Sequence, residues 1–470
     1  MSGRYEKITD EVLADFQQKA DEMKAKVLAA VDPEPGAFPG KCYYFSNDGD
    51  DSNDGLSPDT ALKSISMVEQ LPLQRGDAVL FRRGDLFRGG VNCNVDGITF
   101  SAWGRGEKPV ICGSARNYAK AEYWKKSEVP GIWVCTFPIK NAGVISFDHD
   151  PRTIGKYDVL LGYSIPREPE MEPIPYHLKK DLDFCNDLDT DLLYLKSEEN
   201  PGIRFSRIEI GEMIHLFCFR GEFREDLTVD NLHITMTGGH GISFVMHKGG
   251  EVKNCVFDYV GGSVLWRNGG SIMSPLKNIR FGNAIESYGT CRDFKVRNNW
   301  IYQIYDTGIT HQFHHNHDVV CTQERLEYSD NLIEYCFWAI EYYNYDGKYC
   351  ITRDISVHDN FCRFGGTGWG CTPLRWRMSP MYCFLSHSDE LENYRTERNI
   401  FQFTRGYIYK HFPPVAPDGG LIFKDNIYIQ YSGENFASWG DLTVPFVRKD
   451  AEHFLERILK ETGYILFEAD

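Results

Sequence analysis

The sequence predicts an all-β protein built as a right-handed parallel β-helix, a solenoid whose coils stack along one axis. Two observations lead to this prediction. Short segments that begin with asparagine recur between residues 226 and 432, which is typical of repeat folds. Each segment continues as an alternating apolar run rich in β-branched and aromatic residues, and a period of two indicates strands rather than helices. The recurring residues are Asn231, Asn254, Asn299, Asn331, Asn360, Asn399 and Asn426.

The spacing of these asparagines fits single coils with loops inserted at the turns. Successive gaps are 23, 45, 32, 29, 39 and 27 residues, and the gap of 45 fits two coils. Asparagine tolerates left-handed backbone geometry and can stack its amide on the asparagine of the next coil. A β-propeller is the alternative, but its blades are about 40–45 residues long and carry other signatures. We therefore expect the seven asparagines to form a ladder along one edge.

The chain divides into five parts. Residues 1–40 form a helical segment, an amphipathic helix followed by a linker rich in proline and glycine, and residues 41–120 form the first part of the β-helix. The pattern then breaks over 121–225, which predicts an inserted β-rich subdomain that could wall one side of a groove. Residues 226–440 form the core of the β-helix with an active-site groove. Residues 441–470 form a helical cap, because an uncovered terminal coil would leave an open edge.

Composition and charge restrict the partners of the protein. The chain of 470 residues has a net charge of −16, so its acidic surface repels nucleic acid and anionic lipid. It contains no stretch of 18 apolar residues that would cross a membrane. The N-terminal stretch lacks the apolar core of a secretory signal, which predicts a cytoplasmic location. The sequence leaves the oligomeric state open.

The sequence predicts no cofactor and no metal. Its fourteen cysteines contain no Cys-x-x-Cys pair, so we interpret them as reduced thiols that fill a narrow core. The acidic run over residues 48–54 could ligate calcium, but its spacing does not match an EF-hand and favours a turn rich in Asx residues. The histidines that follow position 310 also match no metal-ligand signature. They are His311, His314, His315 and His317.

Acidic side chains are predicted to gather on neighbouring coils. Three segments share a small residue, an isoleucine and then a polar residue, and their polar residues are Glu286, Thr310 and Glu341. If the segments are coils of a β-helix, these residues stack on one face, with Asp306 a few residues upstream on the middle coil. Stacked acids repel one another, so a fold seldom places them together for stability. Paired carboxylates do suit acid/base cleavage of a glycosidic bond.

The chain resembles right-handed parallel β-helix proteins of carbohydrate metabolism. Three segments resemble the first coils of those proteins: Tyr43-Tyr44-Phe45-Ser46, Asp54-Gly55-Leu56-Ser57-Pro58 and Ala61-Leu62-Lys63-Ser64-Ile65. Asn283-Ala284-Ile285-Glu286 and the stretch from Ile304 to Gln312 are similar to β-helix glycoside hydrolases, most of all to the α-L-fucosidase type, glycoside hydrolase family 141. The resemblance spans about residues 41–432 and implies carboxylate catalysis near Asp306 and Glu341.

The residues predict a glycoside hydrolase with a carbohydrate substrate. Asp306 and Glu341 are the expected acid/base pair, with either order open, and Glu286 is expected to tune them by like-charge repulsion. Aromatic rings offer flat apolar faces to sugars, and arginine or histidine can hold hydroxyl or carboxylate groups. The candidates for binding the sugar are His240, His311, Tyr342, Trp369 and Arg375.

Two other functions stay open at this stage. A polysaccharide lyase on the same scaffold would use His311 or Arg375 as the base beside a uronate carboxylate, with calcium on the acids. A non-catalytic carbohydrate-binding module would use the aromatic residues without needing the acids. Nucleophilic triads are not supported, because no Gly-x-Ser-x-Gly elbow occurs.

Overall fold

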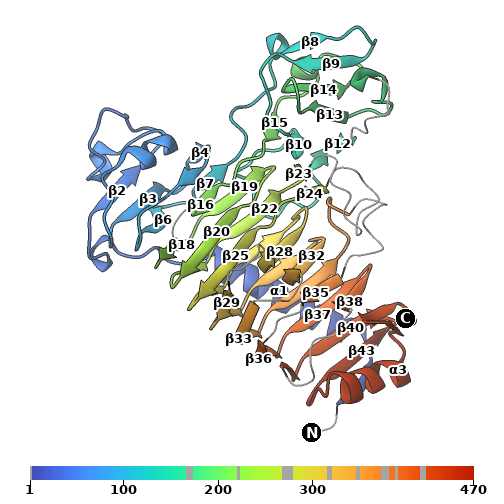
Figure 1. Ribbon diagram of the computed structural model, residues 1–470. Helices are drawn as coiled ribbons and strands as arrows, with labels where there is room; N and C mark the ends of the chain where they lie inside the picture. Colours follow the sequence, from blue (N-terminus) through green and yellow to red (C-terminus); the bar gives the residue numbers. More distant parts are fainter. Residues whose placement is uncertain are drawn as a thin grey trace.

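The chain winds into a stack of coils whose strands pair in parallel from each coil to the next (Figure 1). The computed structural model describes residues 3–165, 173–219, 223–266, 279–314, 320–345, 350–371, 380–386, 390–412 and 420–470. The predicted parallel β-helix is confirmed. Within the described residues, no helix is both long and apolar enough to cross a membrane.

The first sheet has eleven strands, and every neighbouring pair in it is parallel. Its strands in spatial order are β4 (Leu86–Arg88), β7 (Val110–Cys112), β19 (His233–Thr237), β22 (Val256–Val260), β27 (Trp300–Tyr302), β31 (Leu332–Glu334), β34 (Phe361–Gly365), β37 (Ile400–Thr404), β40 (Ile427–Tyr431), β43 (Ile465–Ala469) and β1 (Arg4–Lys7).

A second, branched sheet contains two further series of strands. The second series is β5 (Val91–Asn92), β16 (Phe217–Phe219), β20 (Ile242–Lys248), β25 (Ile285–Arg292), β28 (Thr307–His314), β32 (Trp338–Tyr345), β35 (Pro380–Ser386), β38 (Tyr407–His411) and β41 (Asn435–Trp439), and β42 (Leu442–Pro445) joins it antiparallel. The third series is β2 (Cys42–Phe45), β3 (Ala78–Arg82), β6 (Thr99–Trp103), β18 (Thr228–Asp230), β21 (Glu251–Lys253), β26 (Lys295–Arg297), β30 (Glu327–Ser329), β33 (Cys350–His358), β36 (Glu390–Glu397) and β39 (Leu421–Lys424). The short strands β17 (Arg224–Glu225) and β29 (Cys321–Glu324) also pair within this sheet.

Apolar side chains fill the interior of the coils in columns. Ile242, Ile285, Ile309 and Ile340 are register partners on four consecutive strands, and all four are fully buried. Full burial of such a side chain stabilises the fold by about 1.5–3 kcal/mol. Because strand side chains alternate between faces, the residue after each isoleucine points away from this interior.

An asparagine ladder runs along one turn of the solenoid. Asn299 donates from its backbone N–H (3.1 Å) and its Nδ2 (3.0 Å) to Oδ1 of Asn331. The same pair of bonds links Asn331 to Asn360, Asn360 to Asn399, and Asn399 to Asn426. The ladder ends on Oε1 of the buried Glu461, which accepts both bonds from Asn426.

Two of the seven predicted ladder positions are wrong by one residue. Asn254 has a φ of 55° and is the counterpart of Asn298, which has a φ of 53° and donates to it (2.7 Å). The ladder position on the coil of Asn254 is taken by Cys255, whose backbone N–H donates to Oδ1 of Asn299 (2.9 Å). Asn231 also has a left-handed φ, of 63°. On each of these two coils, the asparagine with left-handed backbone geometry lies one residue before the ladder position. Asparagine suits both the left-handed position and the ladder position, so the sequence pattern does not separate them.

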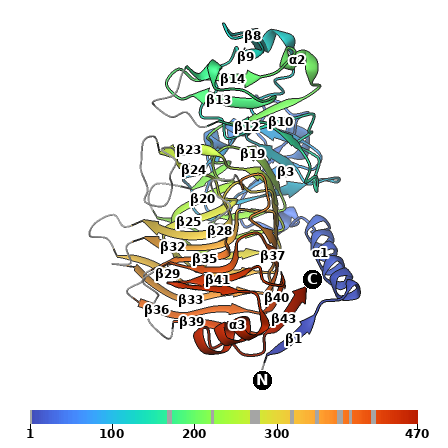
Figure 2. The ribbon, with the colours of Figure 1, turned by 90° about the vertical axis from the view of Figure 1, so that its right-hand side faces the viewer.

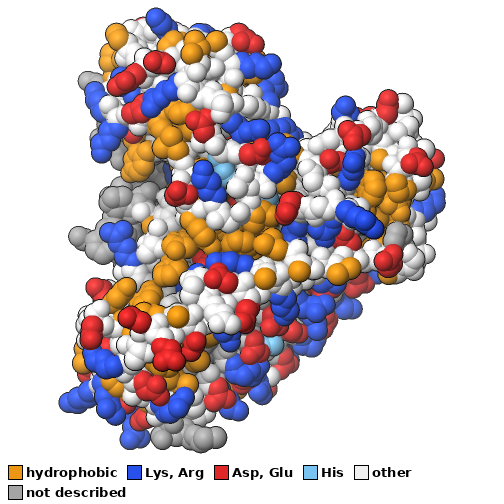
Figure 3. Space-filling view, turned by 180° about the vertical axis from the view of Figure 1, so that it is seen from behind, with side chains coloured by type: hydrophobic (Ala, Val, Ile, Leu, Met, Phe, Trp, Pro, Cys, Tyr) orange, Lys and Arg blue, Asp and Glu red, His pale blue; other side chains and the backbone are white. Residues whose placement is uncertain are grey.

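The N-terminal segment covers the first sheet. Helix α1 (Asp10–Leu28) is capped by Thr9, whose Oγ1 accepts the Val12 N–H (3.3 Å), and its buried face packs on β27, β31 and β34 (Figure 2). Ahead of the helix, the sequence analysis missed strand β1, which pairs in parallel with the C-terminal strand β43. Figure 3 shows the face that carries α1, where acidic and basic side chains are interspersed around an apolar patch.

The C-terminal cap is helical but begins earlier than its apolar pattern predicts. Helix α3 (Arg448–His453) has Val447 as its N-cap residue, so Asp450 lies in the first turn instead of capping it. A π-helical turn (Phe454–Ile458) continues it and buries Phe454 and Leu455 against the end of the solenoid core.

A β-rich subdomain lies between β7 and β16 and has a hydrophobic core of its own. Its strands are β8 (Trp124–Lys126), β9 (Ile132–Cys135), β10 (Val144–Phe147), β11 (Leu160–Leu161), β12 (Tyr163–Ser164), β13 (Asp183–Asp187), β14 (Leu192–Lys196) and β15 (Ile208–Gly211), with the short helix α2 (Pro201–Arg204). A hairpin of β23 (Ser263–Trp266) and β24 (Ile279–Phe281) lies between this subdomain and β25 (Figure 2). Single 3₁₀ turns lie at Pro35–Ala37, Pro58–Thr60, Ile65–Gln70, Ala121–Tyr123 and Ile174–Tyr176.

The acidic run over 48–54 forms local turns. Oδ1 of Asp50 accepts the Ser52 N–H (2.8 Å), and Oδ1 of Asp54 accepts the Leu56 N–H (3.0 Å). Asp51 accepts the backbone N–H groups of Lys63 and Ser64. These bonds are those of the Asx-rich turn that the spacing favours.

The ladder predicts a specific stability effect. Asn331→Ala removes the acceptor of two Asn299 bonds and leaves the buried Asn299 N–H unpaired, which costs about 1–3 kcal/mol. We expect the free energy of unfolding in urea to fall by at least that amount. Asn94→Ala, at an exposed asparagine, is the control and should change it by less than about 0.5 kcal/mol. Equal effects of the two substitutions would contradict a structural role for the ladder.

The cysteines predict a thiol count. Thirteen cysteines have described side chains, none of these thirteen forms a disulfide with another, and eleven of them are buried. Titration of the denatured, unreduced protein with a thiol reagent should therefore give close to fourteen thiols per chain. The folded protein should react at only a few of them. Recovery of ten or fewer thiols, as two disulfides would give, would contradict the prediction.

Candidate functional site

The predicted acidic column exists on the outward face of the second strand series. Glu286 on β25 is the register partner of Thr310 on β28, and Thr310 is the partner of Glu341 on β32. The column continues to Ser243 on one side and to Cys383 and Lys410 on the other. Two strand spacings separate the two glutamates, so their backbones lie about 10 Å apart with the small Thr310 between them.

Glu341 is 3% exposed and has neutral hydrogen-bond donors around it. Its Oε2 accepts from Oγ1 of Thr310 (3.0 Å), Nε2 of Gln312 (3.0 Å) and Oγ1 of Thr307 (3.3 Å). Burial raises the pKa of Glu341 well above its ordinary value, and the nearby Asp306 carboxylate raises it further. The arrangement stabilises the protonated acid, and with three donors on Oε2 the proton belongs on Oε1.

Glu286 accepts hydrogen bonds from two neighbouring side chains. Its Oε2 accepts from Nε2 of His240 and from Nδ2 of Asn283 (3.3 Å). The His240 tautomer follows from its other nitrogen, because Nδ1 accepts the backbone N–H of Asn283 (2.9 Å) and Nε2 must then carry the proton. Both nitrogens of His240 are therefore engaged, and the ring orients Glu286.

A second histidine supports the first. The His215 ring stacks on His240 with ring centres 4.8 Å apart and an angle of 15°. Nδ1 of His215 accepts the backbone N–H of His240 (3.0 Å). Phe281 lies against the His240 ring at 4.9 Å and comes from the hairpin β23–β24. His215 is partly exposed, so this pair of histidines reaches from the buried carboxylate towards solvent.

Asp306 lies at the turn that leads into β28. Its backbone N–H donates to the Gly282 carbonyl, and its carbonyl accepts from Trp338. Asp306 is partly exposed and lies four residues before the outward-facing Thr310 on the same coil. The charge of Asp306 raises the pKa of Glu341 more than the charge of Glu286 does.

Two predicted sugar-binding residues lie inside the solenoid instead of in the groove. His311 is fully buried, stacks on Tyr342 at 4.8 Å, and contacts the Tyr394 hydroxyl. Burial lowers the pKa of His311 to about 3, so it stays neutral there. Tyr342 is also fully buried and bonds to Oγ1 of Thr352 (2.7 Å). Both follow an outward residue directly, and strand alternation turns them inward.

Trp369 lies at the edge of the site. Its ring packs against Tyr305 at 5.0 Å, next to Asp306, and its Nε1 donates to the Gln303 carbonyl (2.7 Å). Arg375 lies outside the described residues, as do the side chains of His314, His315 and His317. Among the described residues, no three His, Cys, Asp or Glu side chains gather as a set of metal ligands.

The structure adds residues that the sequence analysis did not select. Gln312 and Tyr343 are register partners on the outward face, two residues after Thr310 and Glu341. Trp338 lies three residues before Glu341 and forms an aromatic cluster with Phe337 and Tyr343. Because side chains alternate between the two faces of a strand, the sequence could have indicated that Tyr343, and not Tyr342, faces outward with Glu341. Asn283 and His215 gave no signal, because their roles depend on turns and on contacts between coils.

Comparison with known proteins supports the fold. No protein-family model matches the chain, and no curated protein matches it in sequence. A solved structure described as a glycoside hydrolase matches with a TM-score of 0.52 at 10% identity over 92% of this chain and 97% of its own. A lacto-N-biosidase of family GH136 from Eubacterium ramulus gives 0.40 at 13% identity over 98% and 70%, and the pectate lyase Pel9A gives 0.36 at 10% over 85% and 72%. At 10% identity, the match with a TM-score of 0.52 shows a shared fold.

The raised pKa of Glu341 predicts a pH-dependent stability. A buried acid whose folded pKa lies above its unfolded value of about 4.5 stabilises the fold at low pH, and this contribution is lost as pH rises towards the folded pKa. One such proton gives a slope of at most about 1.4 kcal/mol per pH unit. Glu341→Gln abolishes the titration, so its free energy of unfolding relative to the parent protein should increase between pH 5 and pH 8.

Glu327→Gln is the matched control for this measurement. Glu327 lies on β30 of the same branched sheet and pairs with Lys295 (3.1 Å), and its pKa is lowered rather than raised. The free energy of unfolding of Glu327→Gln, relative to that of the parent protein, should not increase between pH 5 and pH 8. If Glu341→Gln and the parent protein show parallel pH profiles, the carboxyl of Glu341 is not held protonated in the fold.

Proposed function

We propose that this protein is a carbohydrate-active enzyme, a glycoside hydrolase that cleaves a glycosidic bond over Thr310 between Glu341 and Glu286. The observation that carries the proposal is the opposite treatment of the two glutamates. Glu341 is buried among neutral donors and kept protonated, whereas Glu286 accepts bonds as a carboxylate from His240 and Asn283. An acid and a base on either side of one bond are what glycoside hydrolysis requires.

Each residue has a role in this reaction. Glu341 donates its proton to the glycosidic oxygen and becomes the carboxylate that its Thr310, Thr307 and Gln312 donors stabilise. Glu286 removes a proton from the attacking water. The sequence analysis paired Asp306 with Glu341 and expected Glu286 to tune them. In the present proposal Glu286 is the base, and Asp306 is the tuning residue, because its charge favours the protonated form of Glu341.

The separation of the two glutamates favours inversion at the anomeric carbon. Their backbones are about 10 Å apart across two strand spacings. Inverting enzymes place their carboxyl groups about 6.5–9.5 Å apart to admit water, whereas retaining enzymes place them about 5–5.5 Å apart. Trp338 and Tyr343 flank Glu341 and offer ring faces for the sugar.

The hydrolase is favoured over the polysaccharide lyase. His311, one of the two candidate lyase bases, is fully buried inside the coil. A lyase also acts on a uronate, and the carboxylates of Glu286 and Asp306 would repel the carboxylate of that sugar. Product analysis separates the two reactions, because only a lyase leaves an unsaturated sugar. As part of the same proposal, we expect the protein to be related to glycoside hydrolase family 141 and to work in the reducing environment of the cytoplasm.

A screen of aryl glycosides and of neutral and uronate oligosaccharides tests the reaction class. We expect sugar products with new reducing ends and no ultraviolet absorbance of their own, and proton NMR of the first product should show inverted anomeric configuration. An unsaturated product that absorbs in the ultraviolet would replace the hydrolase by the lyase. Binding without any product would favour the non-catalytic module.

Substitutions of the acids test the assigned roles on any substrate found. Glu341→Gln and Glu286→Gln should each lower kcat by at least about 100-fold, the low end of what a positioned acid or base contributes. Asp306→Asn should lower kcat less and move the alkaline limb of the pH profile to lower pH, because Glu341 loses a charged neighbour. Glu327→Gln is the control and should leave kcat unchanged. Near-normal turnover by Glu341→Gln would refute the assignment.

A further inference from the structure

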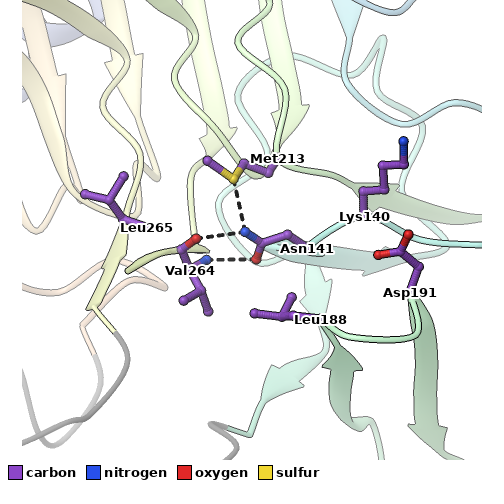
Figure 4. Close-up of a pocket in the computed structure, with 7 residues that line it drawn as sticks. All are labelled: Lys140, Asn141, Leu188, Asp191, Met213, Val264 and Leu265. Carbon is purple, nitrogen blue, oxygen red and sulfur yellow. Dashed lines mark hydrogen bonds between the residues drawn. The ribbon is translucent and has the colours of Figure 1, made fainter. Parts of the chain in front are cut away.

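A cavity of about 310 Å³ opens between the inserted subdomain and the hairpin β23–β24 (Figure 4). This volume is at the small end of the range of ligand sites. The lining residues come from four separate parts of the chain: Lys140, Asn141, Leu188, Asp191, Met213, Val264 and Leu265.

One side chain joins the two walls of the cavity. Nδ2 of Asn141 donates to the Val264 carbonyl (2.8 Å), and Oδ1 of Asn141 accepts the Val264 N–H (2.9 Å). Nδ2 also lies 3.0 Å from Sδ of Met213, and Figure 4 shows Asn141 between these two residues. Oγ of Ser263 donates to the Asn141 carbonyl (2.6 Å). Because these bonds tie the subdomain to the hairpin, the cavity has a defined shape.

The cavity adjoins the acidic site along the backbone. Met213 precedes His215 by two residues, a span of about 7 Å in an extended chain. Val264 pairs with Arg280 in the hairpin, and the next residue, Phe281, contacts His240. The segment from Met213 to His215 is tied to the coil of His240, because Oγ1 of Thr237 donates to the Ile214 carbonyl. The cavity therefore lies beside the segments that hold His240, the hydrogen-bond partner of Glu286.

The lining has the chemistry of a sugar subsite. Met213, Val264 and Leu265 lie on one side of Asn141, and Lys140 and Asp191 lie on the other (Figure 4). A sugar ring has an apolar C–H face and a hydroxyl edge, which match these two sides. Lys140 is the cation among the lining residues, and the lining also contains the acid Asp191. A further acid, Glu212, accepts the backbone N–H of Lys140 (2.7 Å). Two acids beside one cation do not suit the negative charge of a uronate.

We propose that this cavity is a subsite for the neutral sugar residue next to the scissile bond, so the substrate is a neutral oligosaccharide rather than a single sugar on a small aglycone. The proposal rests on the proposed function, since it names the substrate class of the same site. The inserted subdomain thereby sets specificity by enclosing the second sugar.

A cavity-filling variant tests the subsite in catalysis. Leu265 is 41% exposed and lines the cavity, so Leu265→Trp should fill it without disturbing the core. Leu442→Trp is the control, since Leu442 is 50% exposed on β42 at the far end of the solenoid. Leu265→Trp should lower kcat/KM on a neutral oligosaccharide by about tenfold or more, which is about 1.4 kcal/mol, and leave an aryl glycoside of the same sugar unchanged. Equal losses on both substrates would overturn the subsite.

Binding to an inactive protein separates this inference from the hydrolase itself. Calorimetry on Glu341→Gln would use β-1,4-linked trisaccharides of xylose, glucose and galactose, with trigalacturonate as the charged probe. We expect one neutral trisaccharide to bind, and Leu265→Trp but not Leu442→Trp to weaken it about tenfold or more, even if no hydrolysis is ever detected. Preference for trigalacturonate, equal binding by both tryptophan variants, or no binding at millimolar concentration would overturn the subsite.

Discussion

The coil-to-coil strand register is the constraint on which the candidate site depends. It places Glu286, Thr310 and Glu341 in one column although they are separated by 24 and 31 residues in the chain. The buried asparagine ladder fixes this register at a turn of the same coils, through paired bonds from Asn299 to Asn331 and beyond. A slip by one residue would turn the acids inward and the isoleucines outward, so register and function are set by the same contacts.

The fold and the acidic column could be predicted because both follow from periodicity. The recurring asparagines indicate coils, and the isoleucine before each polar residue fixes which side faces outward. The errors have the same origin. His311 and Tyr342 each follow an outward residue, and Asn254 precedes the ladder position by one. In a pattern with period two, an error of one residue moves a side chain to the opposite face.

The rest of the site depends on contacts that no local pattern encodes. Asn283 reaches Glu286 from the turn before its strand, and His215 meets His240 because two coils bring them together. The inserted subdomain is tied to the hairpin β23–β24 by Asn141, whose side chain makes two hydrogen bonds with the backbone of Val264. Turns, loops and insertions carry these residues, and their lengths vary between coils, so sequence spacing gives little information about their partners.

The coil that carries Glu341 holds two buried acids whose surroundings differ in charge. Glu334, seven residues earlier, is also buried, but it is surrounded by Arg363 (2.5 Å), Lys24 (3.7 Å), Nε1 of Trp300 (2.9 Å) and the Tyr157 hydroxyl (2.7 Å). Its charge is compensated, which is the usual condition for burying a carboxylate. Glu341 receives donors that carry no charge and has the acid Asp306 as a neighbour. Burial without compensation destabilises an ionised carboxylate, so the arrangement serves proton transfer better than it serves the stability of the fold.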